Sequence, residues 1–554
     1  MTTRSNGHGT GRPLRRRTIP IAICLGIMTL STGAAVAGAA SPGVKLSTSG
    51  PAGEGPYPYR YPGSGDVQVG SGKTVHGSTC RSGTPQFASP YAVPCVAKFT
   101  GSNGGATSNG VTGTTITLAT RTFPTTANLQ EAEAEARAAG VALPQVTEQV
   151  AEVFVKYFNK VYDLYGRHVV FKTYDTTADA TTEALGQGEA QACADAAAIS
   201  QQLHAFAEDG LLGGGSGPFS QCAAQDHLVE LNGDGYYNEG TFQQYNPYIW
   251  SFSQDCTRIS SNEAEVVATM LANKKAIYAG EPSLTSKTRK FGSYFPDVPA
   301  YIKCSKNFAK IVTTKYHLPL SDFVTYTYSP DIATFAQSAQ QAIVQFKAAG
   351  VTTVLIGSDP YSAGLLTQAA QQQDFSPEWF LEGSALTDED QAVQAYDVPS
   401  EVTGHLFGMS ELSPPTETSG PDSLAGKLYK KLTGHTIPKG TDGDYGSLVY
   451  IFDALQSAGP DLTPQNLARG LHAIPALGAP AYQYGKWSWN IGPTGTAGAG
   501  DHSAGADDRF IWWNGNAISA INGEKGTYVA AFGGKRFSFG QWPTSLPAMF
   551  TKAG

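Results

Sequence analysis

The feature that most constrains the fold is an alternation of helix-like and strand-like segments between residues 114 and 383. The clearest unit is "SPDIATFAQSAQQAIVQFKAAG", in which apolar residues recur at helical spacing and Gly350 stands where a helix should end. The segment 351–359, "VTTVLIGSD", follows as an almost wholly apolar strand. Such a strand suits a parallel sheet that helices cover on both faces. The alternation therefore predicts an α/β fold.

The same pattern extends to both sides of this unit. Strands are predicted at 114–120, 168–175, 276–281 and 378–383, and helices at 146–161, 189–206, 260–275 and 362–373. Ser260 and Glu263 have the spacing of a capping box at the start of the third helix. The span is too long for one ordinary doubly wound sheet. We therefore expect two lobes, each with a mostly parallel sheet flanked by helices.

The N-terminal residues 1–40 have the order of a secretory signal peptide. The basic "RPLRRR" precedes the apolar "TIPIAICLGIMTL", and the small residues of "STGAAVAGAA" follow. The pattern predicts export to the cell envelope or the extracellular space, and Arg15, Arg16 and Arg17 leave a twin-arginine route open. Ile23 precedes Cys24 and most of the apolar run follows it, so the sequence offers no convincing lipobox.

Charge excludes several classes of partner. Residues 1–40 contain five Arg and no acidic residue, so their removal changes the formal net charge from −8 to −13. A chain this acidic is a poor candidate for binding nucleic acid or anionic lipid, because both carry dense negative charge.

Six cysteines remain after the signal, and an even number in an exported chain predicts disulfides. We expect neighbours to pair, as Cys80–Cys95, Cys193–Cys222 and Cys256–Cys304. Residues 41–110 are rich in Gly, Pro and Ser, and we interpret them as a linker that carries the Cys80–Cys95 loop.

No motif predicts catalysis, a cofactor or a metal site. The stretch "VQVGSGKTVHG" (67–77) resembles a phosphate-binding loop, but Val67 replaces the first glycine and the flanks lack a strand and a helix. Neither Gly-x-Ser-x-Gly nor His-Glu-x-x-His occurs. The oxygen-rich "LNGDGYYNEG" (231–240) lacks EF-hand spacing and is interpreted as a turn. The glycine turn in "GLLGGGSGPFSQCAAQ" (210–225) starts a helix, so it suits either a small anionic ligand or no ligand at all.

Several of these motifs, in this order, resemble the type 1 periplasmic-binding-protein fold. The match is to the substrate-binding proteins of branched-chain amino-acid ABC importers. It rests on "GVTGTTITLAT" (110–120), "YFNKVYDLYGRHVVFKTYDT" (157–176), "AAISQQLHAFAEDGLLGGGS", "GDYGSLVYIFDALQSAG" (443–459) and "DHSAGADDRFIWWNGN" (501–516). The resemblance covers about residues 110–516. It implies lobe 1 at 111–255 plus 385–490 and lobe 2 at 256–384 plus 491–554.

The resemblance also implies a ligand site between the lobes. The Ser/Thr cluster of the family's amino-acid binders is reduced here to Ser216 and Ser220. The resemblance therefore implies the fold more strongly than it implies the identity of the ligand. The residues expected at the site are Gly215, Ser216, Ser220, Asp234, Tyr236 and Tyr237 in lobe 1, and Glu281, Ser283, Asp359, Tyr361 and Glu382 in lobe 2. We expect Asp359 or Glu382 to pair with a ligand amine.

The function implied is capture of a small, amino-acid-like or amide-like solute by a monomer. The lobes would close around the solute and deliver it to a membrane ABC permease, with no catalysis and no cofactor. Two alternatives stay open: a ligand sensor that feeds a receptor, and an extracellular enzyme on the same scaffold.

Overall fold

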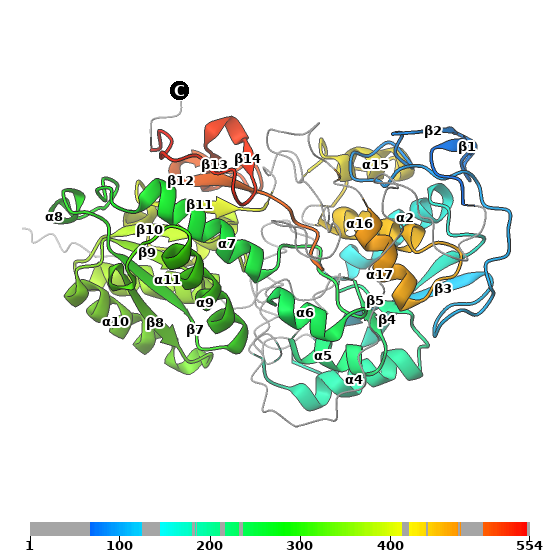
Figure 1. Cartoon of the computed structure of the whole chain (residues 1–554), viewed down its shortest axis with the longest axis horizontal. Helices are drawn as coiled ribbons and strands as arrows, with labels where there is room; N and C mark the ends of the chain where they lie inside the picture. The colour runs from blue at the N-terminus through cyan, green and yellow to red at the C-terminus, as the bar shows by residue number, and fades with distance from the viewer. Residues whose placement is uncertain are drawn as a thin grey trace, which may run out of the picture.

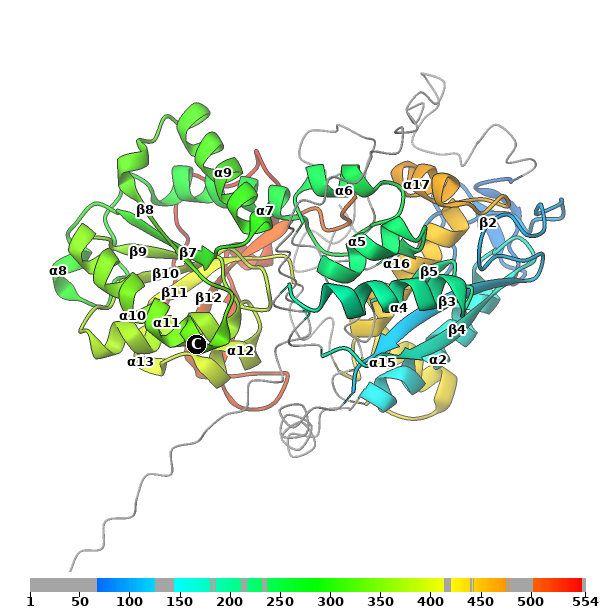
Figure 2. The ribbon, with the colours of Figure 1, turned by 90° about the horizontal axis from the view of Figure 1, so that it is seen from below.

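The computed structural model describes residues 67–124, 144–179, 183, 186–210, 217–231, 237–412, 420–438, 441, 443–474, 477 and 502–550. These residues form two lobes that lie side by side, each built around one sheet with helices on its faces (Figures 1 and 2). The predicted two-lobed α/β architecture is confirmed. The predicted signal segment lies outside the described residues.

Lobe 1 contains a four-stranded parallel sheet. Its strand order is β4 (His168–Asp175), β3 (Thr115–Thr122), β5 (Ala207–Glu208) and β6 (Val229–Glu230). Its helices are α2 (Pro144–Val161), α4 (Glu189–Gln201), α5 (Gly217–Gln225), α6 (Glu239–Tyr245), α15 (Leu424–Thr433), α16 (Gly443–Ser457) and α17 (Pro464–Ala473). The last three return from a distant part of the sequence to complete this lobe.

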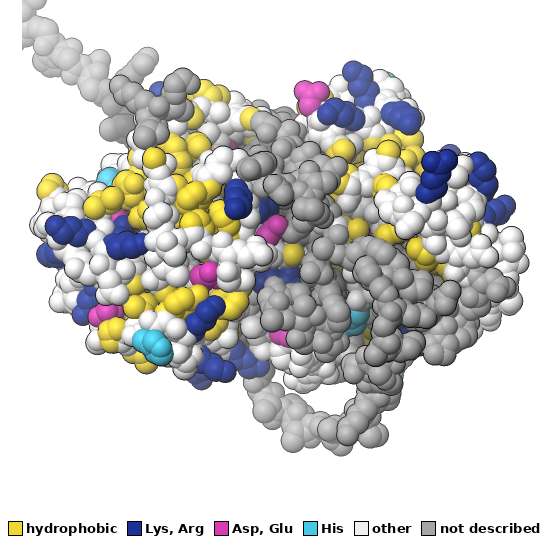
Figure 3. All heavy atoms as spheres, turned by 45° about the horizontal axis from the view of Figure 1, so that its top comes forward, with side chains coloured by type: hydrophobic (Ala, Val, Ile, Leu, Met, Phe, Trp, Pro, Cys, Tyr) yellow, Lys and Arg dark blue, Asp and Glu magenta, His cyan; other side chains and the backbone are white. Residues whose placement is uncertain are grey.

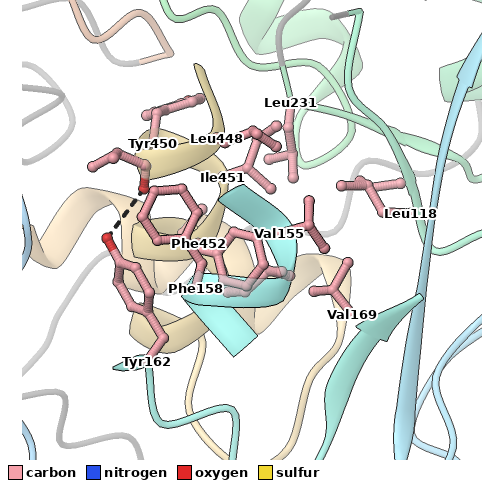
Figure 4. Close-up of a cluster of buried hydrophobic side chains, with 14 of the residues drawn as sticks. Leu118, Val155, Phe158, Tyr162, Val169, Leu231, Leu448, Tyr450, Ile451 and Phe452 are labelled. Atoms are coloured by element: carbon pink, nitrogen blue, oxygen red, sulfur yellow. Dashed lines mark hydrogen bonds between the residues drawn. The ribbon is translucent and has the colours of Figure 1, made fainter. Parts of the chain in front are cut away.

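Aromatic side chains of α2 and α16 meet in the core of lobe 1. Phe158 packs against Phe452 with ring centroids 5.3 Å apart, and Tyr162 packs against the same ring at 5.5 Å (Figure 4). Leu118 of β3 and Val169 of β4 line the other side of this cluster (Figure 4). The helical spacing of the apolar residues in α2 therefore serves to bury one face against both the sheet and α16.

Lobe 2 contains a larger, mixed sheet. Its order is β13 (Lys525–Ala530), β12 (Asp508–Ile518), β11 (Leu406–Ser410), β10 (Glu378–Leu381), β9 (Thr353–Ile356), β7 (Phe291–Pro296) and β8 (Phe323–Tyr328), with β14 (Arg536–Phe537) paired to β12. The strands from β8 to β11 are parallel, and β12 runs antiparallel to β11, β13 and β14.

Helices cover both faces of the lobe 2 sheet. They are α7 (Cys256–Val266), which continues as a π-helical turn (Val267–Leu271), α8 (Pro282–Thr285), α9 (Pro299–Thr314), α10 (Ile332–Ala349), α11 (Pro360–Gln372), α12 (Asp390–Tyr396) and α13 (Pro399–Val402). The α10–β9 unit has the predicted form. Asp331 caps the start of α10, and Gly350 ends it in the left-handed conformation that glycine adopts without strain.

The N-terminal segment is not a spacer from residue 67 onward, so that part of the linker prediction is wrong. Its hairpin of β1 (Ser71–Lys73) and β2 (Thr79–Arg81) includes the Gly-Lys-Thr stretch. Further along, Phe87 and Val93 are buried in the lobe 1 core. The Gln86 side chain donates a hydrogen bond to the Val161 carbonyl (2.7 Å), which ties the segment to the end of α2.

Two local predictions are also wrong. Residues 276–281 form a turn, and the strand of this unit is β7, a few residues later. The start of α7 is capped by Asp255, whose carboxylate accepts hydrogen bonds from the N–H groups of Thr257 and Arg258. Ser260 and Glu263 therefore lie inside the helix and do not form a capping box.

The lobe boundary expected at residue 385 is wrong as well. β11 pairs with β10, so residues 385–412 belong to lobe 2, and lobe 1 resumes at α15. On the C-terminal side, Ala504 still packs in the lobe 1 core, whereas β12 from Asp508 onward belongs to lobe 2. The chain thus crosses between lobes after residue 252, between residues 412 and 420, and after residue 504.

Hydrogen bonds join the crossing segments to one another. The N–H of Ser251 donates to the His502 carbonyl (2.8 Å), and the N–H of Ala504 donates to the Ser251 carbonyl (2.9 Å). The N–H of Gln254 donates to the carboxylate of Glu411 (2.9 Å). These hydrogen bonds link residues beside all three crossings, and we refer to this linked group as the hinge.

The structure contains the three neighbouring disulfides that the sequence predicts. They join Cys80 to Cys95, Cys193 to Cys222 and Cys256 to Cys304, with Cα–Cα distances of 5.6, 5.0 and 5.8 Å. The second connects α4 to α5 and the third connects α7 to α9. Among the described helices, none has the length and apolar character needed to cross a membrane.

Candidate functional site

Both sheets place the carboxyl ends of their parallel strands beside the hinge. In lobe 1, β6 ends at Glu230, which exchanges backbone hydrogen bonds with Tyr248 (2.7 Å) and Trp250 (2.9 Å) just before the first crossing. In lobe 2, β11 ends at Ser410, next to the hinge residue Glu411. Ligands of open α/β sheets bind outside the carboxyl ends of the strands. The region between the lobes is therefore the candidate binding site.

The lobe 2 edge of this region contains a cavity between α7, α9 and the sheet. Its polar lining comprises Ser260, Glu263, Ser293, Tyr301, Ser305 and Glu382. Its interior leaves about 30 Å³ for the centre of a water-sized group. The cavity is thus large enough for a small polar head group, and the remainder of a ligand would extend toward lobe 1.

Two carboxylates share this cavity. Glu263 projects from α7 and Glu382 follows β10, and each residue is only 7% exposed. Ser384 Oγ donates a hydrogen bond to Glu382 Oε1 (2.6 Å). Burial and the nearby charge of Glu382 hold the pKa of Glu263 well above its usual range. A Cβ at Gly357 would lie 3.2 Å from the Glu382 carboxylate, so glycine gives this side chain its room.

The lobe 1 edge is organised by a fully buried arginine near the end of β3. Arg121 binds both carboxylate oxygens of Glu183 (3.0 and 2.9 Å) and one oxygen of Asp195 (3.2 Å). Its guanidinium also lies 3.8 Å from the ring centroid of Phe219 in α5. This network fixes α4 and α5 against the end of β3.

Further acids surround Arg121 at the ends of β5 and β6. Glu208, Asp209 and Glu230 are each fully buried. Burial, followed by the charges of Glu230 and Asp209, raises the pKa of Glu208 well above its usual range, and Arg121 opposes this rise. Among the described residues at this edge, acidic groups therefore outnumber basic groups.

Two of the predicted lobe 1 site residues can be placed. Ser220 is fully buried in the first turn of α5, beside the carboxyl end of the sheet. Tyr237 donates its hydroxyl hydrogen to the Gly217 carbonyl (2.7 Å), so it holds the start of α5. Gly215, Ser216, Asp234 and Tyr236 lie outside the described residues.

Of the predicted lobe 2 site residues, one lines the cavity, two lie at the start of α11 and two lie at α8. Glu382 lines the cavity. Asp359 instead caps α11, where it accepts hydrogen bonds from Ser362 (2.6 and 2.5 Å) and Tyr328 (2.9 Å). Tyr361 is half-buried and packs edge-on against Tyr396.

Glu281 and Ser283 lie far from the other lobe. They flank the start of α8, which forms the end of lobe 2 most distant from lobe 1 (Figures 1 and 2). The sequence pattern predicts a strand at 276–281, and both residues would lie at the end of that strand or just after it. The strand of this unit is β7, which begins at Phe291. Helix α8 therefore lies on the amino-terminal side of β7, opposite the carboxyl ends of the strands where the candidate site lies.

Sequence reasoning missed Glu263, Ser293 and Tyr301. Ser293 lies on β7 and Tyr301 begins α9, and neither element was predicted. Glu263 was assigned to a helix start. The available signal was the run "FGSYFPDVPAY", in which three aromatic residues precede an Asp-x-Pro sequence.

Many Asp and Glu side chains of the described residues are buried in the structure and do not face solvent. On the face seen in Figure 3, Lys and Arg side chains are prominent and Asp and Glu side chains are sparse. Within the described residues, no group of three or more His, Cys, Asp or Glu side chains has the arrangement of a metal site.

Solved structures with a similar fold include solute-binding proteins. A leucine-, isoleucine-, valine-, threonine- and alanine-binding protein from Brucella ovis, in a closed conformation, is 12% identical. The match covers 78% of this chain and 98% of that chain with a TM-score of 0.51. An ABC-transporter solute-binding protein from Rhodopseudomonas palustris HaA2, in complex with p-hydroxybenzoic acid, is 10% identical over 78% and 98% of the two chains, with a TM-score of 0.49.

A fatty acid ABC transporter substrate-binding protein from Thermomonospora curvata is 15% identical over 77% of this chain and 94% of that chain, with a TM-score of 0.48. The sequence matches no protein-family model and no curated protein. The fold is thus the type 1 periplasmic-binding-protein fold that the sequence motifs resemble.

Proposed function

We propose that this protein is an exported solute-binding protein that captures a small molecule between its two lobes and delivers it to a membrane ABC permease. The proposal needs two rigid lobes, a hinge that can bend and polar groups at the facing edges. Two lobes, hydrogen-bonded crossing segments and polar groups at the facing edges support the proposal. Capture would occur by closure of the lobes, without a chemical step.

The observation that carries the proposal is the joint position of the hinge and the cavity. The crossing segments bind one another through Ser251, Gln254 and Glu411, and the strand ends of both sheets lie beside them. The cavity at Glu263 and Glu382 opens among those strand ends. A hinge rotation would therefore bring the Arg121 edge of lobe 1 toward the cavity of lobe 2.

The Brucella ovis structure agrees with this role, because it is a leucine-, isoleucine-, valine-, threonine- and alanine-binding protein. At 12% identity it supports the fold, and the proposed role of this chain rests on its own hinge and cavity.

Release of a bound molecule tests the proposal directly. The purified full-length protein would be denatured, and the released small molecules would be identified by mass spectrometry. Readdition of the released compound should reduce the radius of gyration in small-angle scattering, because the lobes close. A protein that releases nothing, and that stays extended with extracts of the growth medium, would contradict capture by closure.

A further inference from the structure

The cavity in lobe 2 contains a carboxylate that the protein itself does not satisfy. No hydrogen bond or ion pair joins the Glu263 carboxylate to another described residue, although the residue is only 7% exposed. Its charged neighbour in the cavity is Glu382, which is also an acid. Two negative charges in one buried cavity repel each other unless a proton or a cation lies between them.

Other buried acids of lobe 2 have partners, which makes Glu263 an exception. Glu378 binds Arg289 through both oxygens (2.7 and 2.8 Å). Asp390 accepts a hydrogen bond from the N–H of Tyr528 (2.8 Å). Burial of an unpaired carboxylate costs free energy, so a group that stays unpaired inside a cavity is a candidate for ligand contact.

The rest of the cavity lining adds an independent observation. Phe295, Tyr301 and Phe308 surround the space with aromatic rings, and Ser260, Ser293 and Ser305 add hydroxyl groups. Aromatic faces attract organic cations, and hydroxyl oxygens accept hydrogen bonds from ammonium groups. Carboxylates combined with aromatic rings are suited to an alkylammonium head.

The lobe 1 edge has the same charge preference. Among the described residues at this edge, Glu208, Asp209 and Glu230 are buried, and the guanidinium of Arg121 binds Glu183 and Asp195. A ligand carrying only a carboxylate would add negative charge to a region that is already acidic. A ligand with separated positive groups would complement both edges.

Resting on the proposed solute-binding function, we infer that the solute is an organic cation whose ammonium group, remote from any carboxylate, enters the cavity between Glu263 and Glu382. An α-amino acid does not fit this description, because its carboxylate would enter the acidic cavity beside its amine. The chemical class is that of alkyl diamines and related polyamines.

Thermal unfolding of the full-length protein with three matched probes tests the inference. The probes are putrescine, its uncharged diol analogue and leucine. Putrescine is expected to raise the unfolding temperature in a saturable way, whereas the diol and leucine leave it unchanged. A protein that responds to leucine or to the diol as strongly as to putrescine, or to none of the three, overturns the inference.

Variants separate a contact with the ligand from a general charge effect. Glu263→Gln should weaken putrescine binding by about tenfold or more, because a charge-assisted contact is lost. It should also raise the unfolding temperature of the ligand-free protein at alkaline pH, since it removes one of two like charges. The control Glu524→Gln removes one exposed carboxylate in the same lobe, and it should match the parent in both measurements. Equal putrescine binding by Glu263→Gln and the control would refute the contact.

The two levels of the proposal can fail separately. If denatured protein releases a carboxylic acid that also closes the lobes, solute capture stands and the cationic class is wrong. If putrescine binds without closing the lobes, the cavity takes a cation but capture by closure is wrong.

Discussion

A methyl group added at Gly505 should damage the hinge. Gly505 lies in the third crossing segment, and a Cβ there would stand 2.5 Å from Glu411 Oε2, 2.8 Å from Gln254 Cγ and 3.0 Å from Gln254 N. These distances are shorter than van der Waals contact. Accommodation therefore requires either the Glu411 carboxylate or the Gln254 backbone to move, and their 2.9 Å hydrogen bond would be broken.

The size of the effect follows from two contributions. Loss of a hydrogen bond to a charged group costs about 1.5–3 kcal/mol, and overpacking of this half-buried but crowded site adds about 1–3 kcal/mol. Burial raises the pKa of Glu411 to about 7, so above that pH a charged carboxylate would lose its N–H donor. Gly505→Ala is therefore expected to lower the free energy of unfolding by about 3–5 kcal/mol at mildly alkaline pH.

Urea unfolding monitored by tryptophan fluorescence measures this change, with Gly113→Ala as the matched control. The nearest atom to a Cβ at Gly113 is 3.8 Å away, so that variant should differ from the parent by less than about 0.5 kcal/mol. If Gly505→Ala were as stable as Gly113→Ala, the crossing segments would not be packed as tightly as the short distances around Gly505 indicate.

Three further predictions concern stability. Replacing Cys193 and Cys222 by serine should cost about 2–4 kcal/mol, because the link between α4 and α5 is lost; thermal unfolding tests this, and no change would mean that the bridge adds nothing. Arg289→Met should cost about 3–5 kcal/mol in urea unfolding, because it leaves Glu378 buried without its partner; combination with Glu378→Leu should recover part of the loss, and a larger loss in the double variant would refute the reasoning. Burial, followed by the charge of Glu411, raises the pKa of Asp508 to about 7, above the value of about 3.9 in the unfolded chain. The folded state then holds the extra proton, so this group's contribution to stability is present at low pH and is lost as pH rises from about 4 to 7; urea unfolding at several pH values would show the decline, and a rise over that range would contradict it.

The class of fold and much of the local structure follow from patterns within the sequence. The spacing of apolar residues placed α2 and α10, and the continuous apolar run placed β9. Gly350 marked the end of α10, because the left-handed conformation there favours glycine. These features depend on neighbours in the chain, so a single sequence contains the information they need.

The order of the cysteines along the chain was also enough to predict which of them form disulfides. Each pair joins segments adjacent in the chain, such as Cys193 in α4 and Cys222 in α5. By contrast, the composition of residues 67–110 misled the interpretation. A segment rich in Gly and Pro can still pack when a few apolar residues, here Phe87 and Val93, meet a surface made by distant helices.

Which residues line the candidate site depends on packing between segments that are distant in the sequence. Asp359 and Glu382 both follow strands of lobe 2, yet one caps a helix and the other lines the cavity. Glu263 joined the cavity because α7 packs beside α9 and the sheet, a contact between segments far apart in sequence. The charge preference of the site arises the same way. From the sequence alone, a carboxylate is expected to face solvent. The packing of the folded chain shows whether the carboxylate is buried and whether a hydrogen-bonding or charged partner is buried beside it.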